Sequence, residues 1–396
     1  MAVFNRADIL LPDGVDMLRW SVVACDQYTS QPEYWQRVER VVGDAPSTLR
    51  LVYPEAYLAE GDARIEKINA EMKNYLASGI FKEYKNALVY IERTTPSGVR
   101  CGLVGAVDLE AYDYRRGAKS AIRATEGTVL ERIPPRVKIR RGAALELPHI
   151  MLLADDTEKI LVEPLADAEK TPLYDFELME NGGHLRGWLL SEKAAQSAIA
   201  AAERLAGTSA DGLLFAVGDG NHSLASAKAF WEEKKQGLTP AERETDPARY
   251  CLVEVVNIHS PALEFEPIHR VVFGADADAL LAQLEKECGG EGHTVHYITA
   301  HGEGDISLSR EKSKLAVGVL QDFLDKIGAK VDYIHGEDAL RELSAKDGCI
   351  GFILPKPDKS DLFASVIADG ALPRKTFSMG EAYEKRFYTE ARKIEK

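Results

Sequence analysis

The stretch Gly212-Leu-Leu-Phe-Ala-Val217-Gly-Asp-Gly-Asn-His-Ser223-Leu-Ala-Ser-Ala-Lys-Ala-Phe-Trp231 decides the fold. Residues 212–217 form a continuous apolar run of the length of a buried strand, whereas residues 224–231 have the composition and spacing of a helix. Between them, residues 218–223 contain the glycines that a tight turn requires. The segment is therefore predicted to be a strand, a glycine-containing turn and a helix.

Strand and helix patterns alternate outward from this element. Residues 87–91 and 99–107 flank a Thr-Pro-Ser-Gly turn and predict a β-hairpin, with the run 150–153 as a further partner. Further strands are predicted at 251–257, 331–334 and 349–354, and helices at 192–205, 277–287, 315–324, 339–343 and 362–368. This order predicts an α+β (mixed α/β) protein with a strand-rich centre. The glycine-rich stretch Gly289–Gly292 is the best linker, which divides the chain into 1–288 and 293–396.

The composition and net charge of the chain argue against several classes of protein. The 396 residues carry 49 Lys and Arg against 63 Asp and Glu, a net charge of −14, which disfavours binding to duplex nucleic acid. The five cysteines are scattered and never form a Cys-x-x-Cys pair, so neither a disulfide framework nor a cysteine zinc site is expected. The sequence begins without a signal-peptide pattern and has no apolar run of membrane-spanning length, so a cytoplasmic protein without membrane contact is expected.

The charge balance reverses between Arg115 and Arg141. This segment has nine cations and two anions, a net charge of +7, so the rest of the chain carries −21. Such a segment is expected to attract a small anionic ligand, although most of its cations are expected to pair with nearby carboxylates. Arg123 and Glu126 stand out, because a carboxylate near arginines is a candidate base or metal ligand.

The turn before the predicted helix has the features of a phosphate site. Unpaired N–H groups and a partial positive charge lie at a helix N-terminus, and Gly220 lets a ligand approach them. His222 and Ser223 add side-chain donors, and Asp219 is a candidate for holding a cation or accepting a proton. The alternative is that Asp219 or Asn221 only caps the helix. The turn matches neither a Walker A loop nor a complete dinucleotide fingerprint.

Two further places are candidates. In Glu266-Pro-Ile-His-Arg270, His269 and Arg270 together suit a phosphate or a carboxylate, although a histidine after a strand is more often structural. Asp26 follows an apolar strand pattern and is a candidate site carboxylate.

Taken together, these motifs resemble a large prokaryotic family catalogued as domain of unknown function 1015. The resemblance rests on three segments and spans nearly the whole chain: Asp219-Gly-Asn-His222, Asn257-Ile-x-x-Pro261-x-Leu263-x-x-x-Pro267-x-His269-Arg270 and Leu372-Pro-Arg-Lys375. The central motif of the family reads Asp-Gly-x-His-Arg, and similar motifs occur in free-serine kinases of the ParB/sulfiredoxin-like fold, where they bind nucleotide phosphates at a helix N-terminus. The resemblance implies a central mixed sheet of that type with flanking helices, and a smaller C-terminal α/β region. It also implies phosphate binding by Asp219, Gly220, Asn221 and His222.

Two positions depart from the pattern of the family. Ser223 stands where the motif has arginine, and Arg123-Ala-Thr-Glu126-Gly-Thr128 stands where the family has Arg-His-Glu-x-Thr. Phosphoryl transfer depends on positioned cations, so Arg123 or another member of the basic segment is expected to compensate.

The leading hypothesis is a phosphotransferase that uses Mg²⁺ and ATP or ADP and acts on a small hydroxylated metabolite, with free serine as the first choice. Asp219 would carry the metal, and Gly220–Ser223 and Arg123 would hold the phosphates. Glu126 or Asp26 would deprotonate the acceptor, and His269 with Arg270 would bind the carboxylate of the substrate. The alternative is a non-catalytic protein that binds a nucleotide or a phosphorylated metabolite at the same place. A ParB-like role on DNA ranks third because of the net charge.

Overall fold

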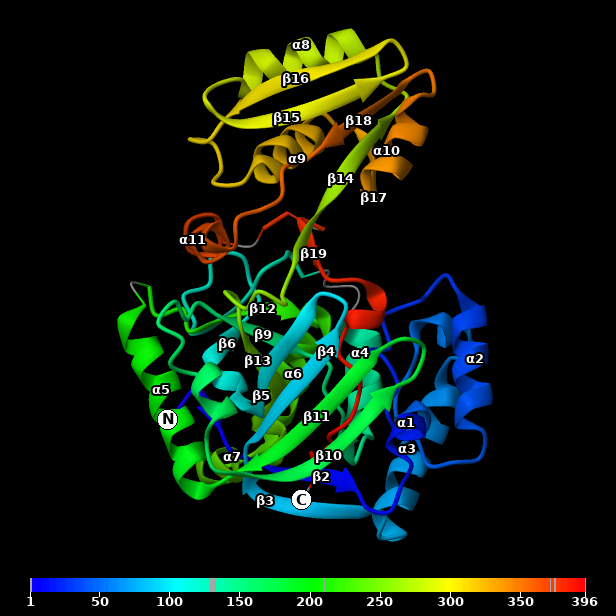
Figure 1. Ribbon diagram of the computed structural model, residues 1–396, viewed down its shortest axis with the longest axis vertical. Helices are drawn as coiled ribbons and strands as arrows, with labels where there is room; N and C mark the ends of the chain where they lie inside the picture. The colour runs from blue at the N-terminus through cyan, green and yellow to red at the C-terminus, as the bar shows by residue number, and fades with distance from the viewer. Residues whose placement is uncertain (1, 129–132, 210, 371, 374, 396) are drawn as a thin grey trace.

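The computed structural model describes residues 2–128, 133–209, 211–370, 372–373 and 375–395. It has a lower lobe built on a large mixed sheet and an upper lobe built on a second, antiparallel sheet (Figure 1). The fold is therefore mixed α/β with two sheets, as the alternation of patterns indicates.

The large sheet has the strand order β10-β11-β4-β5-β13-β9-β12-β7-β6, with β1 paired to β5. The bounds are β10 Lys170–Leu178, β11 Gly183–Leu190, β4 Val89–Thr95, β5 Gly98–Asp108, β13 Tyr250–Asn257, β9 Met151–Ala154, β12 Phe215–Asp219, β7 Ile122–Ala124, β6 Tyr112–Asp113 and β1 Phe4–Asn5. The predicted hairpin is β4–β5, with Thr95 opposite Gly98. However, β9 does not pair with that hairpin: it lies between β13 and β12, because all three are short apolar strands suited to the buried centre of a sheet.

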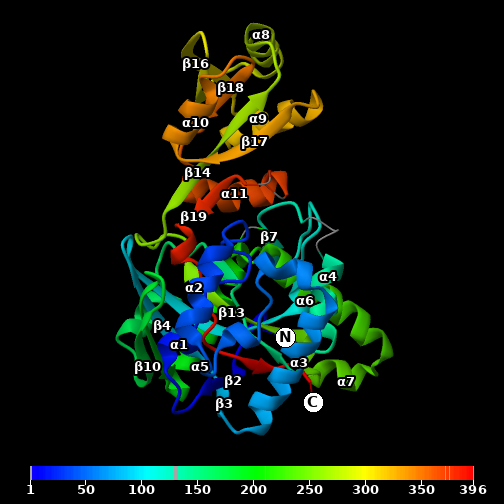
Figure 2. The same ribbon diagram turned by 90° about the vertical axis from the view of Figure 1, so that its right-hand side faces the viewer.

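The second sheet has the order β16-β15-β18-β14-β17, and β19 pairs with β14. Its bounds are β16 Gly302–Ser309, β15 Gly292–Thr299, β18 Cys349–Ile353, β14 Phe265–Phe273, β17 Lys330–His335 and β19 Phe377–Met379. The glycine turn at 289–292 joins α8 to β15 inside the upper lobe, so the boundary expected there does not coincide with the passage between the sheets (Figure 2). The chain passes upward along β14 and returns through α11 and β19.

Helices cover both lobes, and two small strand pairs complete the lower one. The helices are α1 Met17–Trp20, α2 Pro32–Val42, α3 Asp62–Ala77, α4 Ile133–Arg141, α5 Glu192–Thr208, α6 Asn221–Lys234, α7 Pro240–Thr245, α8 Ala277–Cys288, α9 Ala316–Lys326, α10 Glu337–Ser344 and α11 Lys359–Asp369. The strand pairs are β2 Ala7–Pro12 with β3 Phe81–Ala87, and β8 Leu145–Glu146 with β20 Arg392–Lys393.

Alternation along the central strands gives the large sheet two apolar faces. Leu152 and Phe215 pack on the side that holds Leu224 and Trp231 of α6, whereas Leu153 belongs to the core shared with the upper lobe. Helix α6 therefore lies on one face of the sheet, and its first turn lies at the carboxyl end of β12.

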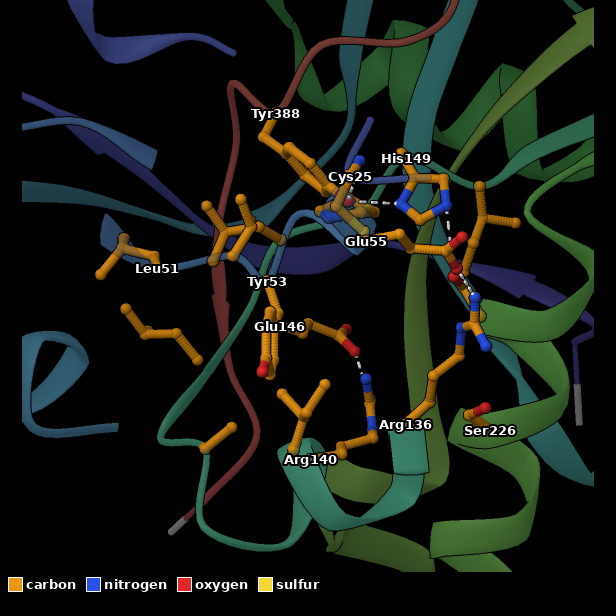
Figure 3. A pocket seen from close by; sticks show the side chains of 18 of the residues that line it. Cys25, Leu51, Tyr53, Glu55, Arg136, Arg140, Glu146, His149, Ser226 and Tyr388 are labelled. Atoms are coloured by element: carbon orange, nitrogen blue, oxygen red, sulfur yellow. Dashed lines mark hydrogen bonds and ion pairs between the residues drawn. The ribbon is translucent and has the colours of Figure 1, made fainter. Parts of the chain in front are cut away.

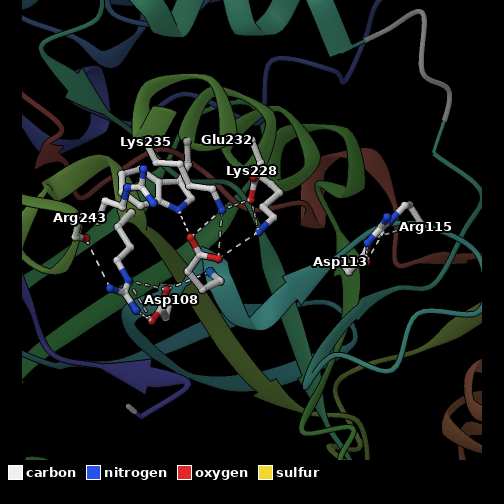
Figure 4. Close-up of polar contacts among 10 residues, drawn as sticks. Asp108, Asp113, Arg115, Lys228, Glu232, Lys235 and Arg243 are labelled. Carbon is white, nitrogen blue, oxygen red and sulfur yellow. Dashed lines mark hydrogen bonds and ion pairs between the residues drawn. The ribbon is translucent and has the colours of Figure 1, made fainter. Parts of the chain in front are cut away.

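A polar cluster anchors the far end of α6 (Figure 4). Glu110 Oε1 accepts hydrogen bonds from Trp231 Nε1 at 2.6 Å and from Lys235 Nζ at 2.9 Å. These bonds fix the last turns of α6 against the segment around Glu110. The turn at Gly220 fixes the first turn, so the helix is held at both of its ends.

Candidate functional site

The turn between β12 and α6 requires glycine at position 220. Gly220 has φ +80° and ψ 26°, a left-handed conformation that other residues adopt at a cost. A Cβ atom at this position would lie 3.0 Å from Cα of Ile150. The turn thus brings backbone and side-chain groups to the start of a 14-residue helix, where unpaired N–H groups favour an anion.

Two side chains of this turn have buried polar atoms that make no hydrogen bond with the described residues. Oδ1 of Asp219 accepts the N–H of Gly220 at 3.0 Å, but Oδ2 of Asp219 makes no hydrogen bond with them. The same holds for Oδ1 of Asn221. A buried polar atom that lacks a partner costs about 1–3 kcal/mol, so such atoms gather where a ligand supplies the missing bond.

A lysine and a second carboxylate complete this group. Nζ of Lys385 lies 3.7 Å from Oδ2 of Asp219, and the two side chains are only 13% and 16% exposed. Glu126 accepts a hydrogen bond from the backbone N–H of Lys375. Burial first, and then the charge of Asp219, raise the pKa of Glu126 to about 7, although Lys385 and Arg270 oppose the shift. A carboxyl group with this pKa is able to exchange a proton at neutral pH.

Asp26 lies on the other side of Lys385, next to His149. Its Oδ2 is 3.9 Å from Nε2 of His149, and its Oδ1 accepts from Gln27 at 3.0 Å. Burial raises the pKa of Asp26, but His149, Gln27 and Lys385 together outweigh burial and leave that pKa below its ordinary value. Asp26 is therefore ionised at neutral pH and is a weaker base than Glu126.

His149 makes a hydrogen bond through each of its ring nitrogens. Burial raises the pKa of the Tyr388 hydroxyl far above its ordinary value, so this hydroxyl is protonated. It accepts the N–H of Cys25 at 3.2 Å and lies 2.7 Å from Nδ1 of His149, in a hydrogen bond whose direction follows the tautomer of the imidazole. Nε2 of His149 lies 3.2 Å from Oγ of Ser223 and 3.9 Å from Oδ2 of Asp26. The imidazole therefore links Tyr388 to the first turn of α6 and to Asp26.

An apolar cavity of about 510 Å³ begins at His149 and Ser223 and extends along α4 (Figure 3). The apolar lining side chains are Leu51, Val52, Tyr53, Leu58, Met72, Pro135, Ile139, Ala143, Leu145, Leu147, Pro148 and Ile150. Two ion pairs interrupt this lining, Arg136 with Glu55 and Arg140 with Glu146. Its volume lies within the range of about 300–1,000 Å³ that is usual for small-molecule sites.

Among the candidates from sequence, Asp26, Glu126 and Asp219 converge around Lys385. Gly220, Asn221 and Ser223 lie in the turn and the first turn of α6. The half-buried His222 belongs to the same helical turn, and its carbonyl accepts a hydrogen bond from Ser226 at 2.6 Å.

Arg123 does not face this group. Its guanidinium donates to the carboxylate and the carbonyl of Asp211, both at 2.8 Å, and to the carbonyl of Ser120 at 2.9 Å. The buried side chain of Arg123 thus connects β7 to the loop before β12. It is therefore not available to hold a phosphate at the turn.

The side chains of His269 and Arg270 also form hydrogen bonds within the protein. They are consecutive on β14, so their side chains point to opposite faces. Nδ1 of His269 accepts the N–H of Leu354 at 3.2 Å. Arg270 donates to Gln321 and to the carbonyl of Lys375, both at 2.9 Å. The two side chains therefore do not form one carboxylate-binding pair, although Arg270 is near enough to Glu126 to lower its pKa.

The basic segment is largely neutralised, as expected for most of its cations. Seven of its nine cations form ion pairs, and Arg132 lies outside the described residues. The excess positive charge of the segment therefore supports the fold of α4 and its neighbours more than it provides a free anion site.

The oxygens at the turn suit Mg²⁺. This ion prefers hard oxygen ligands and is often held by only one or two carboxylates together with water and the phosphates of a substrate. Asp219 Oδ2 and Asn221 Oδ1 are such oxygens and make no hydrogen bond with the residues that the structure describes, and Glu126 is near enough for the charge of Asp219 to raise its pKa. In the described part of the chain no three His, Cys, Asp or Glu side chains form a metal cluster, so a phosphate would have to complete the ligand set.

Comparison with known proteins shows the family. The model of the family described as "Protein of unknown function (DUF1015)" matches residues 10–343, and the chain belongs to this family. No curated protein matches the sequence. Across the described residues, none of the helices has the length and apolar character needed to span a membrane.

Several solved structures are similar over most of their length. A free serine kinase in complex with AMP is 12% identical, with a TM-score of 0.38 over 73% of this chain and 90% of that chain. SbnI with a C-terminal truncation from Staphylococcus aureus is 12% identical, with a TM-score of 0.36 over 70% and 82%. A conserved hypothetical protein from Pyrococcus furiosus is 11% identical, with a TM-score of 0.35 over 73% and 94%.

Proposed function

We propose that this protein is a phosphotransferase that moves a phosphoryl group from ATP or ADP to the hydroxyl group of a small molecule. One observation carries the proposal: Asp219 Oδ2 and Asn221 Oδ1 are buried at the start of α6 and make no hydrogen bond with the described residues, and the ammonium group of Lys385 lies 3.7 Å from Asp219 Oδ2. An incoming Mg²⁺–phosphate group satisfies these oxygens and at the same time the N–H groups of the helix. We also propose that the large sheet is of the ParB/sulfiredoxin-like type, on the basis of the motifs that it presents.

The residues divide the work as follows. Asp219 and Asn221 hold the metal, which neutralises charge on the phosphates when it is bound. The N–H groups that follow Gly220 and the hydroxyl of Ser223 donate to phosphate oxygens, and His222 lies beside them in the first turn. Lys385 supplies the positive charge that the motif arginine would supply, because Ser223 stands in its place.

The transfer itself needs a base for the acceptor. The acceptor oxygen forms a bond to the terminal phosphorus while the bond from that phosphorus to the bridging oxygen of the nucleotide breaks. The proton of the hydroxyl passes to Glu126, whose pKa of about 7 suits this exchange at neutral pH. Asp26, with its lowered pKa, holds His149 in place.

The experiment incubates the purified protein with radiolabelled ATP or ADP, Mg²⁺ and free serine or a panel of small alcohols. Labelled phosphoester in wild type but not in Asp219→Asn is expected, with Asp113→Asn as the matched control, because Asp113 pairs with the exposed Arg115. Absence of nucleotide binding by calorimetry would refute the proposal.

A non-catalytic binding protein is the second candidate. It is favoured by Ser223 at the position of the motif arginine and by the engagement of Arg123 with Asp211, which leave few cations for the transition state. Tight nucleotide binding with no transfer to any acceptor is the outcome that would establish it.

A further inference from the structure

The cavity along α4 is larger and more apolar than free serine would need, and it holds an unusual arginine. Arg140 donates to Glu146 through Nη2, but its Nε is buried and makes no hydrogen bond with the described residues. The side chain of Arg140 is 15% exposed and lies along the cavity wall. A buried N–H of a charged group without an acceptor indicates that a ligand atom belongs there.

The charges around Arg140 do not balance. Glu146 is its carboxylate partner, and Glu146 is shared with Arg392, whose Nε lies 2.8 Å from Oε1. This group of two buried arginines and one carboxylate carries a net charge of +1, and Arg140 and Glu146 are its members that line the cavity. An anionic group of a ligand would cancel that charge where water is scarce and electrostatic attraction is strong.

The end of the cavity at His149 is polar. There Oγ of Ser223 and Nε2 of His149 are hydrogen-bonded to each other, 3.2 Å apart. The walls are otherwise largely apolar, with Leu51, Ile139 and Leu145 among them, and the ion pair of Arg136 with Glu55 interrupts them (Figure 3). The thiol of Cys25 is neutral, because burial raises its pKa to about 12.

We propose that the cavity binds a hydroxy acid with an apolar body, which places its carboxylate at Arg140 and its hydroxyl at His149 and Ser223. The order of the groups follows from the lining: an anion at the surplus cation, hydrocarbon against the apolar walls, and a hydroxyl group at the donor and acceptor pair beside α6. The role of this molecule as the phosphoryl acceptor rests on the proposed function, whereas its binding does not.

The binding experiment uses ω-hydroxyoctanoate as the probe, with octanoate and octanol as partial probes, in calorimetry without nucleotide. Arg140→Gln removes the charge while Oε1 of Glu146 keeps Arg392 and the N–H of Leu252, so this buried carboxylate retains a cation partner. Lys138→Gln is the matched control, because it removes an exposed cation from the same helix. Ile139→Trp fills the cavity and tests the location.

We expect ω-hydroxyoctanoate to bind wild type and Lys138→Gln equally, and Arg140→Gln about tenfold more weakly, as the loss of a charge-assisted hydrogen bond predicts. Octanol should bind wild type and Arg140→Gln alike, and Ile139→Trp should bind none of the probes. Three results would overturn the site: no probe binds, Arg140→Gln and Lys138→Gln weaken binding equally, or Ile139→Trp abolishes binding of ADP instead of the probes. Binding of ω-hydroxyoctanoate without its phosphorylation in the presence of ATP or ADP would count against the proposed function and leave the hydroxy-acid site standing.

Discussion

Nζ of Lys385 lies 3.7 Å from Oδ2 of Asp219, although one residue belongs to the C-terminal segment and the other ends a central strand. The contact is too long for a strong hydrogen bond, and Oδ2 has no closer partner among the described residues. The two opposite charges therefore attract each other without a short hydrogen bond between them.

Replacing the lysine tests this arrangement. Lys385→Met is expected to weaken ADP binding by about tenfold, because a charge-assisted contact to phosphate is lost. Lys393→Met is the control, because Lys393 forms an exposed ion pair with Glu83 at 3.0 Å. Calorimetry of both variants measures the difference, and equal affinities would exclude Lys385 from the phosphate site.

Asp219→Asn separates activity from stability. The change keeps the shape of the side chain but removes the charge that would hold the metal, so we expect phosphoryl transfer to fall by about 100-fold or more. Stability should change little, since the variant replaces a buried charged oxygen that makes no hydrogen bond with the described residues by an uncharged amide, and gives up only the long contact with Lys385. Urea unfolding and the transfer assay give the two values. A large loss of stability would assign Asp219 a structural role.

Glu126 should make stability depend on pH. Its pKa is raised to about 7 from an ordinary value of 4.5, so the folded state keeps a proton that the unfolded state releases. The stability that this group contributes is fully present below pH 4.5 and is lost as the pH rises through about 7. Glu126→Gln is therefore expected to be more stable than wild type by about 1–3 kcal/mol at pH 8 without metal, and equal to it at pH 4. Thermal unfolding of the variant and wild type at the two pH values measures this difference in stability. A difference that does not grow with pH would contradict the expectation.

Gly220→Ala tests the requirement for glycine in the turn. Both Gly220 and Gly117 have positive φ, +80° and +77°, so alanine at either position costs about 1 kcal/mol in backbone conformation. Only at Gly220 would the new Cβ meet a neighbour, at 3.0 Å from Ile150, whereas at Gly117 nothing lies within 4 Å. Urea unfolding should show a larger loss for Gly220→Ala than for Gly117→Ala, together with weaker ADP binding. Equal losses would mean that the turn relaxes away from Ile150.

Tyr388→Phe should remove a buried hydrogen bond of His149. The variant lacks the hydroxyl that bonds to Nδ1 of His149 and accepts from Cys25, so we expect a loss of about 1–3 kcal/mol from the buried groups left without partners. Urea unfolding of the variant and wild type measures the loss. Tyr84→Phe, on β3 away from the site, is the control. Equal losses in the two variants would show that the hydrogen bonds of Tyr388 add no stability.

Sequence patterns predicted the elements that local rules determine. The strand, turn and helix around Asp219 follow from an apolar run, a glycine and an alanine-rich stretch, and the structure places them as expected. Sequence motifs name Asp26, Glu126 and Asp219 as candidate carboxylates one by one, and their relation to Lys385 is a property of the tertiary fold. The pairing of β9 was not predictable, because several short apolar strands suit a central position equally well.

The residues that sequence analysis missed come from segments without a pattern. Lys385, His149 and Tyr388 lie in irregular chain, and only the tertiary fold brings them to α6. Conversely, Arg123 was assigned to phosphate because no local rule shows that Asp211 lies within 2.8 Å of it. Ion pairs between distant residues are a property of the folded chain, and charge counts along the sequence do not reveal them.

The return of the C-terminal segment to the lower lobe also bears on biosynthesis. Arg93 donates to the carbonyls of Tyr383 and Lys385 in this segment. Tyr388 and Arg392 of the same segment bond to His149 and Glu146, which are synthesised much earlier. A nascent chain of residues 1–370 contains the turn at Gly220 and most of the cavity wall but lacks Lys385, Tyr388 and Arg392. Since domains fold as they emerge, the lower lobe acquires these three side chains late in synthesis. A chain that terminates before Lys385 would therefore lack the ion partner of Asp219 and the hydrogen bond between Tyr388 and His149.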